Sequence, residues 1–118
     1  MSDKPQDLKP RTKAFALRVI RMYSKLPKNE SVAQVLGKQA LRSGTSVGAN
    51  YREANRGVSR ADFANKIGTV QKEAAETQYW LEILLDSGLA GSGNAQELLK
   101  ESSELLAIFA SIDKKLKE

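Results

Sequence analysis

The chain of 118 residues contains neither cysteine nor histidine. The missing cysteines exclude disulfide bonds, thiolate metal sites and a cysteine nucleophile. Without histidine, the usual zinc sites, the Glu-x-x-His pattern of di-iron bundles and any Ser–His pair are excluded as well. We therefore expect no cofactor, no metal site and no catalytic residue.

Aromatic residues and long apolar runs are also scarce. Aromatic residues make up 6% of the chain, and only three prolines occur. No apolar run approaches the roughly 18 residues of a membrane span, and residues 1–11 lack the apolar core of a signal peptide. We expect a soluble cytoplasmic protein that does not contact a membrane.

Charge is divided unevenly along the chain. Residues 1–60 contain thirteen Lys or Arg and four acids, whereas residues 61–118 contain six basic and ten acidic residues. The two halves therefore carry net charges of +9 and −4 within an overall charge of +5. This division can serve a polyanion site on the first half, or bring oppositely charged surfaces together within or between subunits.

Helical periodicity appears in four stretches, and no stretch alternates as a strand does. The predicted helices span about 11–25, 32–55, 60–86 and 95–117. Ser31 with Gln34 resembles a capping box for the second helix, and Ser59 is the predicted N-cap of the third. The sequence thus predicts an all-α, antiparallel up-down-up-down four-helix bundle in one domain, residues 11–118, after a flexible arm of residues 1–10.

Basic residues gather on one face of each of the first two predicted helices. The second helix also contains Gly37, Gly44 and Gly48, which disfavour a helix. Two explanations are possible: close packing against another helix, or a backbone opening near Ser43–Ser46. Tyr23 and Tyr51 are the visible candidates for stacking on a base. The candidate nucleic-acid-binding residues are Arg11, Arg18, Arg21, Lys25, Lys38, Arg42, Arg52 and Arg56.

The third and fourth helices have more apolar surface than one small interior obviously absorbs. Trp80 is better suited to filling a core or an interface than to stacking on a base, because apolar neighbours surround it. We expect part of this surface to lie between subunits. The candidate interface residues are Trp80, Ile83, Leu84, Leu99 and Leu106.

The segment 41–89 resembles a known family. The matching positions are Ser46, Asn50, Glu53, Ser59, Asp62, Phe63, Glu73, Glu76, Leu81 and Gly88. The run is similar to the four-helix-bundle proteins encoded by intervening sequences in bacterial 23S rRNA genes, which are related to an accessory protein of diversity-generating retroelements. The resemblance implies a homopentamer of four-helix bundles, and partners that include RNA or DNA and a protein encoded nearby.

Three functions remain open at this stage. The first is a non-enzymatic oligomer that binds nucleic acid, RNA rather than DNA, through the basic surface of the first two helices. The second is a structural or protein-docking scaffold without nucleic-acid contact. The third is an enzyme that uses carboxylates, which we disfavour because we expect Glu53 to be a buried hydrogen-bonding group with a structural role.

Overall fold

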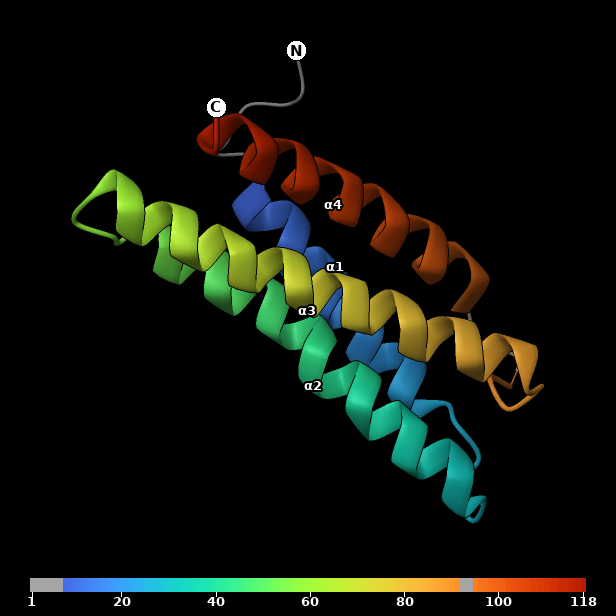
Figure 1. Cartoon of the computed structure of the whole chain (residues 1–118). Helices are drawn as coiled ribbons and strands as arrows, with labels where there is room; N and C mark the ends of the chain where they lie inside the picture. The colour runs from blue at the N-terminus through green and yellow to red at the C-terminus, as the bar shows by residue number, and fades with distance from the viewer. Residues whose placement is uncertain (1–7, 92–94) are drawn as a thin grey trace.

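The computed structural model describes residues 8–91 and 95–118. It contains four helices, α1 (Leu8–Ser24), α2 (Ser31–Ala54), α3 (Arg60–Asp86) and α4 (Ala95–Leu116), shown in Figure 1. Within the described ranges there is no strand. The predicted all-α four-helix bundle is therefore confirmed.

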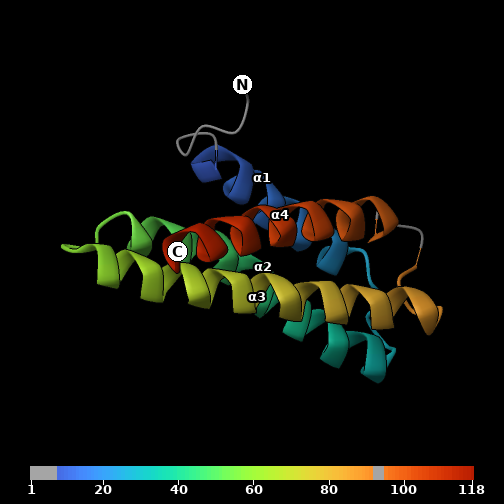
Figure 2. The same ribbon diagram turned by 45° about the horizontal axis from the view of Figure 1, so that its top comes forward.

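The helices form a ring in which each contacts the next, and α4 returns to contact α1. Figure 2 shows α1 and α4 together above α2 and α3. The molecule measures 47 × 26 × 21 Å. α1 is the shortest helix, and its contact with α2 is far more extensive than its contact with α4. None of the helices in the described ranges is long and apolar enough to cross a bilayer.

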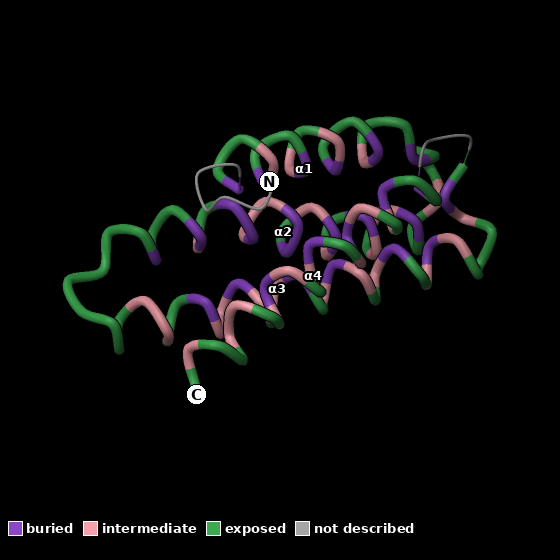
Figure 3. Tube along the Cα trace, turned by 90° about the horizontal axis from the view of Figure 1, so that it is seen from above, coloured by how far each residue is buried: buried purple, intermediate pink, exposed green. Residues whose placement is uncertain are grey.

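Side chains from all four helices fill one interior. Phe15, Tyr51, Ile67 and Phe109 are each at most 2% exposed. The rings of Tyr51 and Phe109 lie 5.5 Å apart at a tilted angle that aromatic pairs favour. Figure 3 shows buried residues along the inward side of the helices. Since Tyr51 belongs to this core, it is not available to stack on a base.

Glycines on one side of α2 allow α1 to approach closely. A Cβ atom added to Gly44 would lie 2.9 Å from Cγ2 of Val19, and one added to Gly48 would lie 3.0 Å from Oγ1 of Thr12. The side chains of Tyr23 and Leu26 occupy the same space beside Gly37. Close packing therefore accounts for these glycines.

The backbone of α2 does not open near its middle. The Ser43, Thr45 and Ser46 hydroxyls each donate to the carbonyl oxygen of the residue four positions earlier, over 2.8–3.0 Å. Thr77 of α3 also donates to Ser43 Oγ, over 2.8 Å. These polar side chains are thus satisfied within the bundle.

Two helix starts differ from the predictions. α1 begins at Leu8 rather than Arg11, because the Leu8 side chain is buried. Pro10 is tolerated because the backbone N–H groups of a first helical turn have no acceptor within the helix. Residues 8–10 therefore belong to the bundle, and residues 1–7 of the predicted arm lie outside the described residues. At α2 the N-cap is Glu30, whose Oε1 accepts from the Ala33 amide over 3.0 Å.

The predicted capping box at Ser31 is therefore wrong. Gln34 instead fixes the preceding turn: its Nε2 donates to the Pro27 carbonyl over 2.9 Å, and its Oε1 accepts from the Tyr23 hydroxyl over 3.2 Å. The Ser59 N-cap of α3 is confirmed, with Oγ accepting from the Asp62 amide over 3.1 Å.

We predict that Gly44→Ala destabilises the protein although alanine is the better helix former. The new methyl group would overlap Val19, a stiff β-branched side chain, and the cost is about 1–3 kcal/mol. Gly68→Ala is the matched control, because nothing lies within 4 Å of a Cβ added there. We expect it to stabilise by about 0.5–1 kcal/mol. Urea unfolding measures both, and Gly44→Ala as stable as Gly68→Ala would contradict the close contact.

Candidate nucleic-acid interface

The cations of α1 lie on two sides of the helix. Arg11, Arg18 and Arg21 lie on the side that meets α4, and so does Lys25, which directly follows the helix. Lys13 lies on the side that meets α2. The candidates of the first predicted helix therefore do not lie next to those of the second helix, and the eight candidates do not form one surface.

Arg11 is held by two carboxylates of α4. Its Nε donates to Glu101 over 2.8 Å, and its Nη2 donates to Glu101 and to Glu104 over 2.9 Å each. The hydrogen bonds to Glu101 raise the pKa of the Arg11 guanidinium. The Glu101 side chain is only 18% exposed, so this contact joins α1 to α4 across a partly buried boundary.

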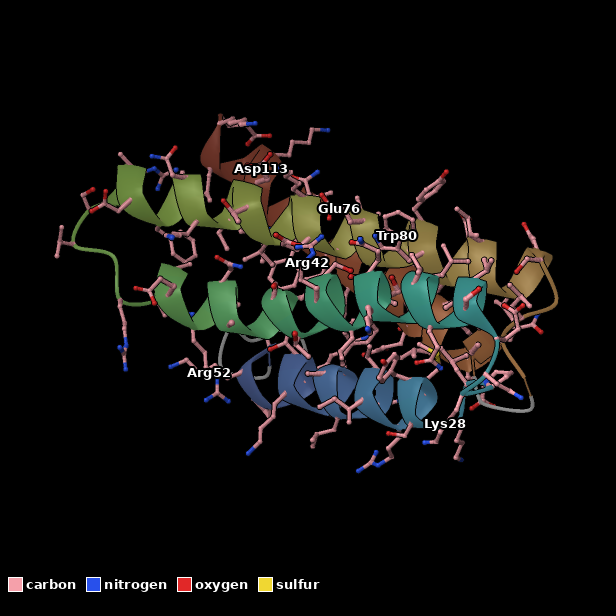
Figure 4. All side chains as sticks on the ribbon, turned by 90° about the horizontal axis from the view of Figure 1, so that it is seen from below. Lys28, Arg42, Arg52, Glu76, Trp80 and Asp113 are labelled. Atoms are coloured by element: carbon pink, nitrogen blue, oxygen red, sulfur yellow. The ribbon has the colours of Figure 1, made fainter. Side chains whose placement is uncertain are left out.

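Arg42 makes the corresponding contact between α2 and α3. Its Nη2 donates to Glu76 over 2.6 Å, and its Nη1 donates to Glu73 over 3.4 Å. The hydrogen bond to Glu76 raises the pKa of the Arg42 guanidinium. Figure 4 shows Arg42 and Glu76 meeting between the two helices. Two of the eight candidates, Arg11 and Arg42, therefore form ion pairs within the chain.

Three other candidates surround a recess between α1 and α4. Arg18, Arg21 and Lys25 line it together with Met22 and with Leu98 of α4, and its volume is about 70 Å³. Met22 and Leu98 are buried and close its floor. Among the described residues, those that line this α1–α4 recess include no carboxylate.

A second hollow, the α1–α2 groove, runs along the glycine contact. Small side chains of both helices line its volume of about 260 Å³, with Lys13 and Arg52 as its cations. Figure 4 shows Arg52 on the α1 side of α2. The lining residues are Thr12, Lys13, Ala16, Thr45, Gly48, Ala49 and Arg52. Lys13 is absent from our sequence-based candidates, because we chose residues beside the apolar stripe.

The remaining two candidates lie on the outer surface of α2. Lys38 is exposed, and no described residue forms an ion pair with it. Arg56 lies near the end of α2 in a hollow that Glu53 and Asp62 also line. These carboxylates make the surroundings of Arg56 less favourable for a phosphate than those of the recess.

The predicted subunit interface needs one correction. Leu84 is fully buried in the core and contributes no outer surface. Trp80, Leu99 and Leu106 are partly buried against the core, and Ile83 is also partly exposed. Tyr79, which we did not select, is 55% exposed and its ring lies 5.3 Å from that of Trp80.

The carboxylates that could have served a carboxylate enzyme are used elsewhere or lie apart in the described part of the chain. Glu73 and Glu76 bind Arg42, and no group of three possible metal ligands occurs among the described residues. Glu53 is exposed, contrary to our prediction of a buried group, because it lies on the outer side of α2. Asn50, one turn earlier on α2, donates its side-chain Nδ2 hydrogen to the Ser46 carbonyl over 2.9 Å.

The comparisons with known proteins agree with the bundle. The family model for the 23S rRNA-intervening sequence protein matches residues 6–111. The chain belongs to this family. The family resemblance that we inferred from the motif residues is therefore confirmed.

This chain is similar to a solved structure of a protein of unknown function from the S23 ribosomal protein family of Bacteroides thetaiotaomicron VPI-5482. The two sequences are 41% identical, and the alignment covers 97% of this chain and 99% of the other. The TM-score is 0.83. No curated protein matches the chain. The comparisons thus indicate no enzymatic family.

We predict that Arg11→Gln lowers the free energy of unfolding by about 1 kcal/mol, because it leaves the partly buried Glu101 without its guanidinium. Arg42→Gln should cost less, since the Arg42 side chain is 53% exposed. Lys28→Gln, at an exposed position, is the control for loss of one charge. Urea unfolding measures the three variants, and Arg11→Gln as stable as Lys28→Gln would contradict a stabilising role for the ion pair with Glu101.

Proposed function

We propose that this chain is a non-enzymatic nucleic-acid-binding protein that holds phosphates along both sides of α1. The observation that carries the proposal is the charge of residues 8–29. This stretch contains seven Lys or Arg and no acid. Among the described residues, Arg11 is the only one of the seven in an ion pair.

The arrangement of the free cations supports contact with a polyanion. The α1–α4 recess and the α1–α2 groove lie on opposite sides of one helix, and each has cations at its rim. A strand that follows α1 would meet Arg18, Arg21 and Lys25 on one side and Lys13 and Arg52 on the other. Contacts of this kind bind phosphates without reading bases.

RNA is our preferred partner because the family takes its description from intervening sequences of 23S rRNA. Sequence-specific recognition has little support, since Tyr51 is buried and the Tyr23 hydroxyl donates to Gln34. We therefore expect similar affinities for RNAs of different sequence, and an affinity that falls steeply with salt.

We predict that single-stranded RNA of about 12 nucleotides binds, and that binding weakens as salt rises from about 50 to about 200 mM. Lys13→Gln combined with Arg52→Gln should weaken binding and reduce the salt slope by about 1. The matched control combines Lys114→Gln with Lys115→Gln, which removes the same charge at the end of α4. Fluorescence anisotropy measures both, and equal losses in the two variants would refute a site along α1.

We also propose that the protein works as a homo-oligomer. Tyr79 exposes an aromatic ring beside Trp80, whose buried Nε1 has no hydrogen-bond partner among the described residues. Tryptophan and tyrosine are enriched at protein interfaces, where one end is buried and the polar end finds a partner. This surface on α3 lies apart from the recess and the groove, so assembly and binding of RNA are compatible.

We predict that Tyr79→Glu shifts the protein toward monomers, because it places a charge on the apolar surface that subunits would bury. Light scattering measures the molar mass of the particle. Gln96→Glu, which adds the same charge at an exposed position of α4, should leave the mass unchanged. An unchanged mass for Tyr79→Glu would exclude this surface from the interface.

A further inference from the structure

The α1–α4 recess differs from an ordinary row of surface cations because it has a floor. Arg18, Arg21 and Lys25 follow each other at intervals of three and four residues, so they lie on one side of α1 and its C-terminal extension. Leu98 of α4 and Met22 close the space between them. A ligand in the recess would therefore lose water on its inner side, and charge–charge attraction would be stronger there than on an open surface.

The size of the recess restricts the ligand. Its volume of about 70 Å³ exceeds the roughly 10–15 Å³ that one water molecule requires. It is well below the roughly 300–1,000 Å³ of pockets that hold drug-sized molecules. A single tetrahedral oxyanion fits these limits, whereas a nucleoside does not.

The charge of the recess indicates which oxyanion it favours. Three cations at this spacing repel each other, and like charges three or four residues apart destabilise a helix by about 0.2–0.5 kcal/mol per pair. The dipole of α1 favours a cation in its last turn, at Arg21, but its effect is weak further back at Arg18. A terminal phosphate carries about −1.5 to −2 at neutral pH, more than the single negative charge of a phosphodiester. It would relieve the repulsion more completely.

We infer that the α1–α4 recess binds a terminal phosphate monoester of a nucleic acid, with Arg18, Arg21 and Lys25 as its ligands. This inference rests on the proposed function and names the part of the RNA that the recess recognises. The two guanidinium groups can each donate two parallel hydrogen bonds to phosphate oxygens, and Lys25 adds a point charge. The α1–α2 groove would then hold phosphodiesters, without preference for an end.

The test compares two RNAs of about 12 nucleotides that carry the same 3′ fluorescein label and differ only in a 5′-phosphate or a 5′-hydroxyl group. We expect the wild-type protein to bind the phosphorylated RNA at least about threefold more tightly at about 100 mM salt. Arg18→Gln should remove this difference, because it should weaken binding of the phosphorylated RNA more than binding of the 5′-hydroxyl RNA. Arg21→Gln and Lys25→Gln are independent variants of exposed side chains. Lys115→Gln, near the opposite end of the bundle, is the control and should keep the preference.

The outcomes separate this inference from the proposed function. Equal affinity of the wild-type protein for the two RNAs would overturn the recess as a phosphate site while leaving binding of RNA intact. A preference that survives all three recess variants would overturn it as well. If neither RNA binds, the proposed function fails, and calorimetric titration with uridine 5′-monophosphate and with inorganic phosphate decides the recess. Binding of uridine 5′-monophosphate or of inorganic phosphate that Arg18→Gln abolishes would support the site. No binding of either, or binding that Arg18→Gln leaves unchanged, would overturn it.

Discussion

The close contact between α1 and α2 determines the rest of the surface. Val19 and Thr12 lie directly on Gly44 and Gly48, so α1 has little freedom to rotate about its axis. Because the Cα–Cβ directions of a helix are fixed relative to one another, the rotation of α1 sets the side of the helix from which each of its cations projects. Arg18 and Arg21 point toward α4, and Lys13 remains beside α2.

Opposite charges from the two halves of the sequence meet within the folded chain. Glu101 and Glu104 of α4 bind Arg11, and Glu73 and Glu76 of α3 bind Arg42. Each arginine thereby joins two neighbouring helices. Four acids of the second half are used in this way, and the remaining cations of α1 have no acidic neighbour on their own helix. The same division of charge therefore supports both the fold and the proposed binding of phosphates.

Most of the fold could be predicted because local signals were strong. The apolar period of the helices and the Ser59 N-cap are properties of short segments, and the structure confirms them. The small-residue contact of α2 was also recognisable, because glycines inside a helix require a compensating contact. The start of α1 was harder to predict. Burial of Leu8 in the bundle extends the helix to this residue. The local sequence does not reveal the extension, because Pro10 suggests a break in the helix.

The candidate site was less predictable, because a side chain with opposite charge can come from a distant part of the chain. Arg11 and Arg18 lie on the same side of α1 in sequence terms, yet α4 supplies carboxylates to one and the apolar side chain of Leu98 to the other. Similarly, Ile83 and Leu84 are neighbours in an apolar stretch of α3, and the sequence pattern does not show which of the two the core buries. Leu84 is buried, and the unselected Tyr79 is exposed.

The sequence by itself determined four helices, their approximate ends and an unequal distribution of charge, because these depend on residues a few positions apart. Tertiary structure decided which arginines are bound to acids and which remain free, and it placed Leu98 beneath three cations to form a recess. The physical reason is that hydrogen bonds and burial act over a few ångströms, so they depend on which helices become neighbours. The glycines of α2 and the core side chains together set those neighbours.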